Sequence, residues 1–370
     1  MPLKCDLSPM ARGYLVLEDG TVYEGSIFGY RSSASGEVVF TTGMSGYQES
    51  ITDPSCRSQL LVMSYPLIGD CGIIEGYSQS DRVQIGGLIV REHCVVPTEA
   101  YGGSSIDSFL DEHGVPGISG IDTRDLIVRI RDKGTMKGAI VSDGRNPKDV
   151  VKELESLDLN PEISPVSGVS AKEIYGIDSG KELTVGVLDC GSRTAIIENL
   201  SSRFNVTVFP YDTPSDVITA RKVDGLVFTN GPGDPAHKDI LNTVVRTGKD
   251  LTGVLPMYGI CFGSQTLALS FGAETYKMSV GHRGNNQPVL FEDRVYITSQ
   301  NHGYAVSEES LEGTGLIANH INVNDGTVEG CRHKDLDIFT TQYHPEAGPG
   351  PADTLFLFDR FGKVMKEAKK

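Results

Sequence analysis

The amino-acid sequence predicts an α/β protein with two domains, and three observations support that expectation. Its 370 residues are more than one ordinary core organises, since a domain has about 150 residues as a soft average. The first half contains short alternating runs separated by turn residues, which is typical of a β-rich mixed α/β domain. From residue 183 onward, apolar strand-like runs alternate with helix-like segments, and this order predicts a doubly wound parallel sheet.

The first predicted domain, residues 1–165, begins with strand signals. The stretch GYLVLEDGTVYEGSIFG alternates around Asp19-Gly20, which predicts a β-hairpin. The runs GEVVFTTG, SQLLVMSYP and VQIGGLIVRE are further expected strands. This half of the chain therefore predicts a sheet before any helix.

Two helices are expected near the end of this domain. In GIDTRDLIVRIRDKG, either Asp122 or Thr123 can cap a helix, and Gly134 can end it. In NPKDVVKELESLD, Asn146 can cap a second helix whose first position is Pro147. Both segments place apolar side chains on one face, so each is predicted to cover the sheet.

Residues 166–182 are predicted to form a linker, because they are rich in Ser, Gly and Lys. Residues 183–370 form the second predicted domain. Its expected strands are LTVGVLDCG, NVTVFPY, VDGLVFTNG and GVLPMYGIC, and its expected helices are RTAIIENLSSRF, PSDVITARK, HKDILNTVVRTG and GSQTLALSFG. A doubly wound sheet binds its ligand at the carboxyl ends of the strands, so the site is expected there.

Composition excludes several classes of protein. With 33 Lys and Arg against 49 Asp and Glu, the formal charge is −16, which argues against a nucleic-acid or anionic-membrane surface. No apolar run approaches the ~18 residues that a membrane span needs. The seven cysteines are scattered without a CxxC pair, which argues against a disulfide framework. These features predict a cytoplasmic protein with reduced thiols.

The heptapeptide GICFGSQ carries the strongest chemical signal. It places Cys261 between two glycines, after a strand-like run and before a helix-like one, as in the G-x-S-x-G nucleophile elbow. A helix N-terminus favours the thiolate, and the turn leaves backbone N–H groups free to hold an oxyanion. The alternative on this stretch alone is a buried structural cysteine in a glycine-rich turn.

A nucleophilic thiol needs a base, and YHPEAGPGP supplies one. His344 and Glu346 stand at positions i and i+2, on one side of an extended segment, so Glu346 can orient the imidazole. A surface loop is the alternative for such a tripeptide. Other histidines are expected to be solvated loop or helix residues, namely His93, His113, His237, His320 and His333.

Two further stretches follow expected strands. NGPGDP brings two glycines whose N–H groups can complete an oxyanion hole, and SQNHGYAV offers amides suited to a zwitterion. Ordinary turns are the alternatives for both. No P-loop, dinucleotide fingerprint or His/carboxylate metal cluster is evident, so neither a metal nor a bound cofactor is expected on this chain.

Taken together, GICFGSQ, NGPGDP and YHPEAGPGP resemble the class I, triad-type glutamine amidotransferases. GEVVFTTGMSGYQESITDPS, GISGIDTRDLIVRIRDKG and YKMSVGHRGNNQPV resemble a narrower family, the small glutaminase chains of carbamoyl-phosphate synthetases. The resemblance covers nearly the whole chain from Gly13. It implies that the second domain has the class I amidotransferase fold and hydrolyses L-glutamine to glutamate and ammonia.

The resemblance also implies a large partner chain and assigns site residues. The partner would use bicarbonate, ATP and a divalent metal to make carbamoyl phosphate for arginine and pyrimidine synthesis, in a hetero-oligomer. On this chain, Cys261 would attack the amide carbon, His344 would shuttle the proton and Glu346 would orient it. The residues implied in glutamine binding are Ser55, Gly231, Gly233, Phe262, Gln265, Asn301, Gly303 and Tyr304.

This sequence departs from the family pattern at two positions beside the nucleophile. It has Ser264 where the family usually has His, and Phe262 where Leu is frequent. Neither position belongs to the triad, so altered affinity or rate is expected, with the chemistry retained. Two other functions stay open: a free-standing glutamine or γ-glutamyl hydrolase, and a non-catalytic regulatory subunit.

Overall fold

The chain divides into two compact units in the computed structural model, which describes residues 11–98, 103–160 and 162–370. The first unit comprises the residues up to Thr52 together with Ser58–Leu159. The second comprises Asp53–Arg57 together with Asn160–Lys370, so it takes in a short segment from the first half of the chain. The domain limits expected at residues 165 and 183 stay predictions.

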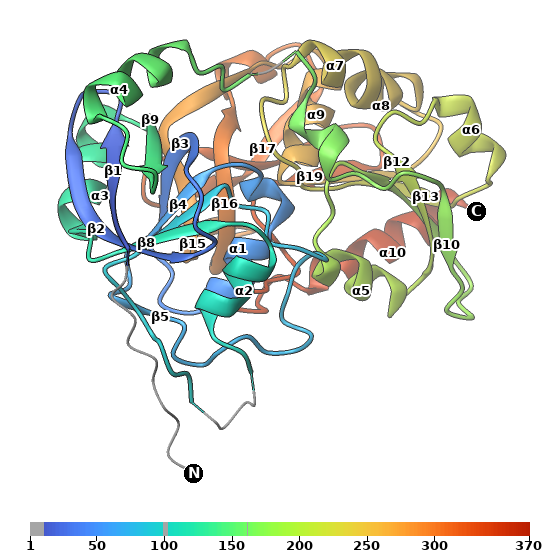
Figure 1. Ribbon diagram of the computed structural model, residues 1–370. Helices are drawn as coiled ribbons and strands as arrows, with labels where there is room; N and C mark the ends of the chain where they lie inside the picture. The colour runs from blue at the N-terminus through green and yellow to red at the C-terminus, as the bar shows by residue number, and fades with distance from the viewer. Residues whose placement is uncertain (1–10, 99–102, 161) are drawn as a thin grey trace. The chain divides into compact units, whose positions relative to one another are not determined.

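The first unit is organised around a closed β-barrel. Its strands are β1 (Arg12–Leu17), β2 (Val22–Gly29), β3 (Ala34–Thr41), β4 (Leu60–Met63), β5 (Leu67–Ile68), β6 (Gly87–Ile89), β7 (Glu92–His93), β8 (Pro116–Ser119) and β9 (Met136–Val141). Seven of them close the barrel in the order β1-β2-β8-β6-β4-β3-β9, and β5 pairs with β7 in a separate two-stranded sheet. Figure 1 labels β1, β2, β3, β4, β8 and β9 of the barrel. The predicted hairpin is confirmed, since β1 and β2 are antiparallel and Gly20 in their turn has a φ of 84°.

Helices α1 (Tyr47–Thr52), α2 (Ile106–Glu112), α3 (Thr123–Lys133) and α4 (Pro147–Ser156) complete this unit. Of the two caps considered for α3, Asp122 is the one used, because its carboxylate accepts a hydrogen bond from the backbone N–H of Asp125 at 3.1 Å. Gly134 ends the helix with a φ of 90°, a conformation that glycine adopts without strain. The predicted start and end of α3 are therefore confirmed.

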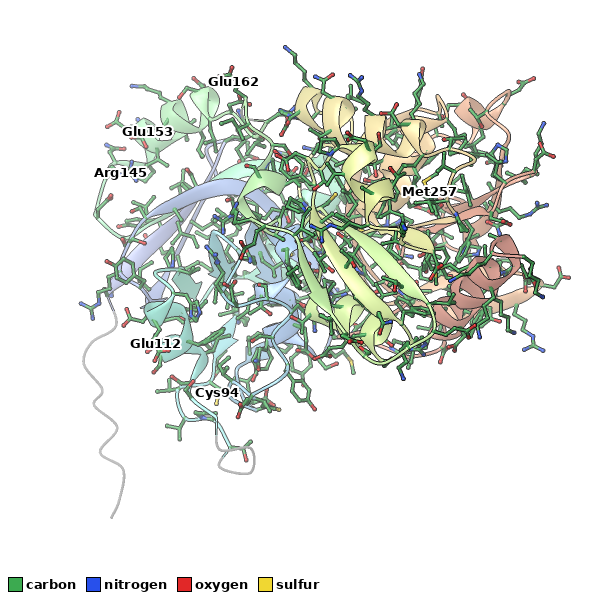
Figure 2. All side chains as sticks on the ribbon, turned by 90° about the vertical axis from the view of Figure 1, so that its right-hand side faces the viewer. Cys94, Glu112, Arg145, Glu153, Glu162 and Met257 are labelled. Atoms are coloured by element: carbon green, nitrogen blue, oxygen red, sulfur yellow. The ribbon has the colours of Figure 1, made fainter. Side chains whose placement is uncertain are left out.

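Helix α4 begins as its sequence predicts. Asn146 caps it, and Pro147 occupies the first helical position, where its missing N–H costs nothing. Val150 and Leu154 on its inner face are buried. Arg145 and Glu153, labelled in Figure 2, form an ion pair on the outer face.

The second unit is built on a ten-stranded mixed sheet. Its strands are β10 (Tyr175–Ile177), β11 (Thr184–Asp189), β12 (Asn205–Pro210), β13 (Gly225–Phe228), β14 (Met257–Ile260), β15 (Thr275–Phe291), β16 (Arg294–Val306), β17 (Leu316–Asn322), β18 (Val328–His333) and β19 (Ile338–Thr341). The order across the sheet is β10-β12-β11-β13-β14-β19-β18-β16-β15-β17. Strands β12, β11, β13, β14 and β19 are parallel, as predicted, whereas the other strands pair antiparallel.

Helices cover both faces of the parallel strands. They are α5 (Thr194–Ser201), α6 (Ser215–Ala220), α7 (Lys238–Ile240), which continues through a π turn (Leu241–Val245) into α8 (Arg246–Asp250), α9 (Phe262–Ser270) and α10 (Phe356–Ala368). Figure 1 shows α5 and α10 on one side of the parallel strands and α7, α8 and α9 on the other. Apolar side chains of α5 and α10 form one core with the sheet, and those of α6, α7, the π turn and α9 form another. Neighbouring strand residues alternate between the two cores, since Val227 faces the first and Phe228 the second. The predicted doubly wound fold is confirmed.

The segment expected to be a linker packs into this unit. Strand β10 pairs with β12 at the edge of the sheet, and a short 3₁₀ turn (Pro165–Gly168) is capped by Ser164 and buries Val166 completely. Its Ser-rich composition therefore reflects capping and turn formation. None of the helices in the described part of the chain is long and apolar enough to cross a membrane.

Candidate active site

Cys261 lies on a sharp turn between β14 and α9, as the glycine frame predicts. Its backbone has φ 55° and ψ −104°, a conformation that is strained for a residue with a side chain. The backbone N–H of Cys261 donates to Thr341 O at 2.7 Å, which ties the turn to the end of β19. Because Phe262 is the first residue of α9, its N–H has no partner within the helix.

The two glycines of the frame are required by close backbone approach. A Cβ at Gly259 would lie 2.5 Å from the carbonyl oxygen of Gly263. A Cβ at Gly263 would overlap the carbonyl oxygen of Phe228 in β13. Each contact is with backbone, which cannot move aside cheaply, so only glycine fits at either position.

His344 and Glu346 follow β19 and reach the same edge of the sheet. Nδ1 of His344 lies 2.7 Å from Oε1 of Glu346, and both side chains are fully buried. Burial acts to lower the pKa of His344, but the charges of Glu346 and Cys261 raise it overall from 6.5 to about 10. The other nitrogen, Nε2, is buried without a hydrogen-bond partner among the described residues. The arrangement therefore favours the imidazolium form of His344.

A buried guanidinium holds the orienting carboxylate. Nη1 of Arg193 donates to Glu346 Oε1 at 3.2 Å and to Ala347 O at 3.1 Å. Nε of Arg193 lies 3.7 Å from Oδ2 of Asp53, and the three charged side chains are at most 3% exposed. Arg193 thus links two buried carboxylates that come from distant parts of the sequence.

Asp53 also organises the segment that carries Ser55. One carboxylate oxygen of Asp53 accepts from the N–H of Ser55 at 2.9 Å, and the other accepts from Nδ2 of Asn301 at 3.0 Å. Nδ2 of Asn230 donates to Ser55 Oγ at 2.9 Å. Asn230 begins the NGPGDP stretch after β13, so Ser55 lies next to the expected oxyanion loop.

The glycines of that loop are closely packed. A Cβ at Gly231 would overlap the carbonyl oxygen of Cys190, at the end of β11. Gly233 has a φ of 89°, and a Cβ there would lie 2.8 Å from Pro165. The loop therefore lies against the end of the neighbouring strand.

The remaining expected glutamine-binding residues also meet at this edge. Gln265 is 2% exposed, and its Nε2 donates to the carbonyl oxygen of Tyr304 at 2.7 Å. The Cys261 thiol donates to the carbonyl oxygen of Asn301 at 3.7 Å. Asn301 and Tyr304 both lie in β16, and Gly303 lies between them. All eleven residues expected at the site thus belong to one unit. Those from Gly231 to Gln265 and from His344 to Glu346 follow parallel strands, whereas Asn301, Gly303 and Tyr304 lie in the antiparallel strand β16 and Ser55 lies in a 3₁₀ turn.

Ser264 faces away from the triad. Its hydroxyl donates to Thr340 Oγ1 at 2.8 Å, and that oxygen accepts the backbone N–H of Cys331 at 2.9 Å. Ser264 is 2% exposed, so it serves the packing of α9 against β18 and β19.

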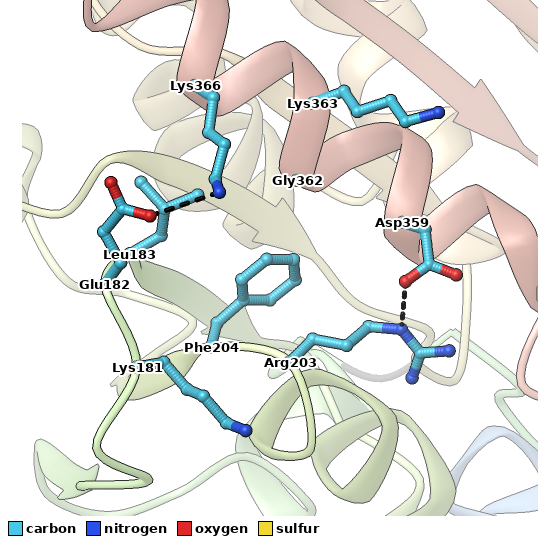
Figure 3. Close-up of a pocket in the computed structure, with 9 residues that line it drawn as sticks. All are labelled: Lys181, Glu182, Leu183, Arg203, Phe204, Asp359, Gly362, Lys363 and Lys366. Atoms are coloured by element: carbon cyan, nitrogen blue, oxygen red, sulfur yellow. Dashed lines mark hydrogen bonds and ion pairs between the residues drawn. The ribbon is translucent and has the colours of Figure 1, made fainter.

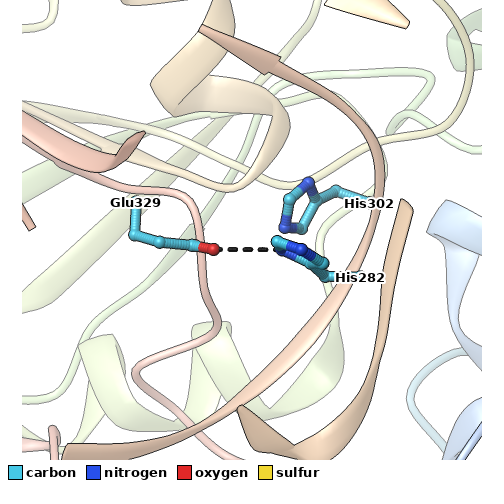
Figure 4. A group of neighbouring side chains, drawn as sticks. All are labelled: His282, His302 and Glu329. Carbon is cyan, nitrogen blue, oxygen red and sulfur yellow. Dashed lines mark hydrogen bonds and ion pairs between the residues drawn. The ribbon is translucent and has the colours of Figure 1, made fainter. Parts of the chain in front are cut away.

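A cluster of His282, His302 and Glu329 lies near the site, although the three are far apart in the sequence (Figure 4). One ligand atom from each lies within 4.8 Å of the others. The nitrogens of His282 already face Glu329 at 3.1 Å and Asp325 at 2.9 Å. Burial acts to lower the pKa of His282, but the two carboxylates raise it overall.

His302 has oxygen partners of its own. Its nitrogens lie 2.8 Å from Tyr304 O and 3.0 Å from Gln300 Oε1, and burial lowers its pKa well below 6.5. Hydrogen bonds therefore account for the nitrogens of both histidines, whereas Oε2 of Glu329 is buried without a hydrogen-bond partner among the described residues. The cluster supports the strand that bears Asn301 and Gly303. Of the five histidines that were expected to be solvated, His93, His237 and His320 are buried, so the expectation is wrong for these three.

A cavity of about 300 Å³ in the second unit lies between the residues just before β11, those just after α5, and α10. Ion pairs flank it, with Lys366 Nζ 3.2 Å from Glu182 Oε2 and Arg203 Nε 2.8 Å from Asp359 Oδ1 (Figure 3). None of its lining residues belongs to the expected site. The candidate site is therefore the one around Cys261 and not this cavity.

Sequence reasoning missed several residues of the site. Arg193 and Asp53 carry no local signal, because only the fold buries their charges together. The NGPGDP stretch predicts a role for its two glycines and gives no signal for Asn230. Gln342, two residues before His344, carries no signal in the sequence either, although its amide nitrogen lies 3.7 Å from the sulfur of Cys261.

We predict that Arg193→Met strongly destabilises the protein. The substitution leaves Asp53 buried without its counter-charge and leaves Glu346 with His344 alone, and breaking a buried pair in this way costs about 3–5 kcal/mol. Urea unfolding measures the change. Arg360→Met is the matched control, because Arg360 pairs with Glu292 on the surface, where removal costs at most about 1 kcal/mol. Equal unfolding free energies for the two variants would contradict the role assigned to Arg193.

Comparison with known proteins places this geometry in a family. Residues 15–140 match the model of the carbamoyl-phosphate synthase small chain, CPSase domain, and residues 186–364 match that of the class I glutamine amidotransferases. Proteins described as carbamoyl phosphate synthase small chain are similar over almost their whole length. The one from Methanopyrus kandleri is 45% identical and covers 96% of this chain and 99% of its own.

Two bacterial relatives with the same description agree. The one from Caldanaerobacter subterraneus subsp. tengcongensis is 45% identical over 97% of this chain and 98% of its own, and the one from Staphylococcus epidermidis is 42% identical over 98% of each. Similarity at this level spans both units and the segment between them. The chain therefore belongs to the carbamoyl-phosphate synthase small-chain family, and its second unit carries a class I glutamine amidotransferase domain.

Proposed function

We propose that this chain is the glutaminase subunit of a carbamoyl-phosphate synthase, hydrolysing L-glutamine through a cysteine thioester and delivering ammonia to a large subunit. The observation that carries the proposal is the convergence of Cys261, His344 and Glu346 at the carboxyl edge of the sheet, in a chain of this family. A thiolate next to an imidazolium that is oriented by a carboxylate is suited to breaking an amide.

In the first half of the reaction, the Cys261 thiolate attacks the side-chain amide carbon of glutamine. The C–S bond forms as the carbonyl π pair moves onto oxygen, and the N–H of Phe262 with the backbone of Gly231 and Gly233 stabilises that oxyanion. His344 then gives its proton to the amide nitrogen. The C–N bond breaks, and ammonia leaves a γ-glutamyl thioester.

In the second half, water attacks the thioester carbon while His344 takes the water proton. The C–S bond breaks and glutamate departs. Glu346 keeps the imidazole in one orientation through both halves, because its Oε1 accepts the Nδ1–H of His344.

The α-amino and α-carboxylate groups of glutamine would be held by the residues around β16 and the Asp53–Arg57 segment. Ser55 offers a hydroxyl and Asn301 a carbonyl oxygen next to the thiol, while Gln265 and Tyr304 are joined by a hydrogen bond and Gly303 lies beside Tyr304 in β16. A zwitterion needs both donors and acceptors, and this set supplies both.

The partner in this proposal is a large subunit that binds bicarbonate, ATP and a divalent metal, so the small chain itself needs no cofactor. We place the reaction in the cytoplasm. The six cysteines of the described residues are all free, which agrees with a reducing compartment.

Cys261→Ser tests the mechanism directly. We expect the assembled enzyme to lose glutamine-dependent synthesis and to keep ammonia-dependent synthesis, because only the nucleophile is changed. Carbamoyl phosphate formation with each nitrogen source is the measurement. Retention of glutaminase activity by the variant would overturn the mechanism.

Addition of the partner distinguishes a synthetase subunit from a free-standing hydrolase. We expect the purified chain to hydrolyse glutamine slowly and to accelerate when the large subunit is added. Glutamate release is measured with and without the partner. A rate that is independent of the partner would favour a free-standing glutamine hydrolase, and no hydrolysis in either case would favour a regulatory subunit.

The pH dependence of catalysis follows from the raised pKa of His344. The imidazolium persists up to about pH 10 and is lost above it. Glu346→Gln removes the charge that raises this pKa, so the alkaline limb of kcat/KM for glutamine should move to lower pH. The rate should also fall, by roughly a hundredfold or more. Glu292→Gln, on the surface of the same unit, is the control and should leave the profile unchanged. An unmoved alkaline limb in Glu346→Gln would exclude this coupling.

A further inference from the structure

Gln342 is a buried amide that the catalytic scheme leaves without a role. It lies directly after β19, two residues before His344, and is 1% exposed. Its backbone N–H donates to Glu329 O at 2.7 Å, so the main chain holds the residue in place. The side chain points toward the nucleophile, with Nε2 at 3.7 Å from Cys261 Sγ.

Hydrogen bonds determine which end of this amide faces the sulfur. Gln265 approaches the carbonyl oxygen of Tyr304 at 2.7 Å, and a carbonyl oxygen only accepts, so the atom of Gln265 must be its NH₂ group. The same nitrogen lies 2.9 Å from the side chain of Gln342, which must therefore present its oxygen. The NH₂ group of Gln342 is then directed at Cys261.

This donor distinguishes the two protonation states of the nucleophile. A neutral thiol can donate to Asn301 O, which lies 3.7 Å from Sγ, but a thiolate has no proton to give there. The hydrogen bond from Gln342 instead becomes stronger when the sulfur is charged, because charge-assisted hydrogen bonds are the stronger ones. Gln342 therefore acts in the same direction as the imidazolium of His344.

We propose that Gln342 is a second hydrogen-bond donor to the Cys261 thiolate, held in orientation by Gln265 and Tyr304. It stabilises the nucleophilic form and fixes the direction of the sulfur. Because Gln265 is also an expected glutamine-binding residue, the same amide chain runs from the substrate pocket to the nucleophile. The inference rests on the proposed role of Cys261 as the attacking group.

The test is the pH profile of alkylation at Cys261 in the full chain. Iodoacetamide reacts with the thiolate, and the modified Cys261 peptide is followed by mass spectrometry so that other cysteines do not contribute. In Gln342→Leu, we expect the midpoint of the profile to move up by about one pH unit or more, since a hydrogen bond to a charged group has that magnitude. The kcat/KM for glutamine should fall by roughly tenfold or more in parallel.

Gln342→Glu keeps the size of the side chain and can still accept from Gln265, so it preserves packing if the leucine variant fails to fold. It places a negative charge beside the sulfur, and the midpoint should rise further than in Gln342→Leu. Gln48→Leu is the matched control, because Gln48 is a buried amide of the first unit whose Nε2 donates to Ile74 O and to Ser78 Oγ. Its midpoint should stay at the wild-type value.

An unchanged alkylation midpoint in folded Gln342→Leu or Gln342→Glu overturns the proposal, even if activity is lost. A shift of the same size in Gln48→Leu also overturns it, because the effect would then come from loosened packing. Neither result bears on the glutaminase assignment, whose failure would appear separately as hydrolysis that survives Cys261→Ser.

Discussion

The interaction between His344 and Glu346 depends on one buried guanidinium. Two carboxylates, Asp53 and Glu346, are fully enclosed in the second unit, and burial of either without a positive partner would cost several kcal/mol. Arg193 contacts both and also binds the carbonyl oxygen of Ala347. The same group that makes the two charges tolerable therefore fixes the loop after β19, and with it the imidazole. The contacts of Arg193 therefore support both the geometry of the proposed triad and the stability of the second unit.

A second constraint comes from the parallel strands. Strands β11, β13, β14 and β19 end at one edge, so the turns that follow them meet there without any further device. Backbone approaches of Gly231 to Cys190 and of Gly263 to Phe228 lock neighbouring turns together. This packing holds Cys261 in its positive-φ conformation, and it requires Gly231 in the loop after β13 and Gly263 in the first turn of α9.

Local signals made much of this fold and site predictable from the sequence. A few neighbouring residues are enough to predict each of three features: the hairpin at Asp19-Gly20, the helix caps Asp122 and Asn146, and the glycine frame of Cys261. By contrast, the antiparallel half of the sheet was not predicted. Strands β15 and β16 are interrupted by two register shifts, which break the alternation of apolar and polar residues.

The turn between β15 and β16 also lacks the usual signal. It is made by Glu292 and Asp293 with φ of 49° and 63°, where glycine or asparagine is typical. Arg193, Asp53 and Gln342 went unassigned for a different reason. Each acts through partners that are distant in sequence, and neither spacing nor composition records which charges and amides the fold will enclose together.

The short segment Asp53–Arg57 limits how the second unit can be reused in another protein, because it lies within the first half of the chain. It precedes the rest of the second unit by about a hundred residues of chain, yet it supplies a counter-charge for Arg193 and the hydroxyl bonded to Asn230. A gene fragment that starts at the apparent domain boundary would encode Cys261, His344 and Glu346 and still lack the segment Asp53–Arg57. Recombination that shuffles the amidotransferase half as a cassette would therefore have to bring along a piece of its upstream neighbour, which ties the inheritance of the two halves together.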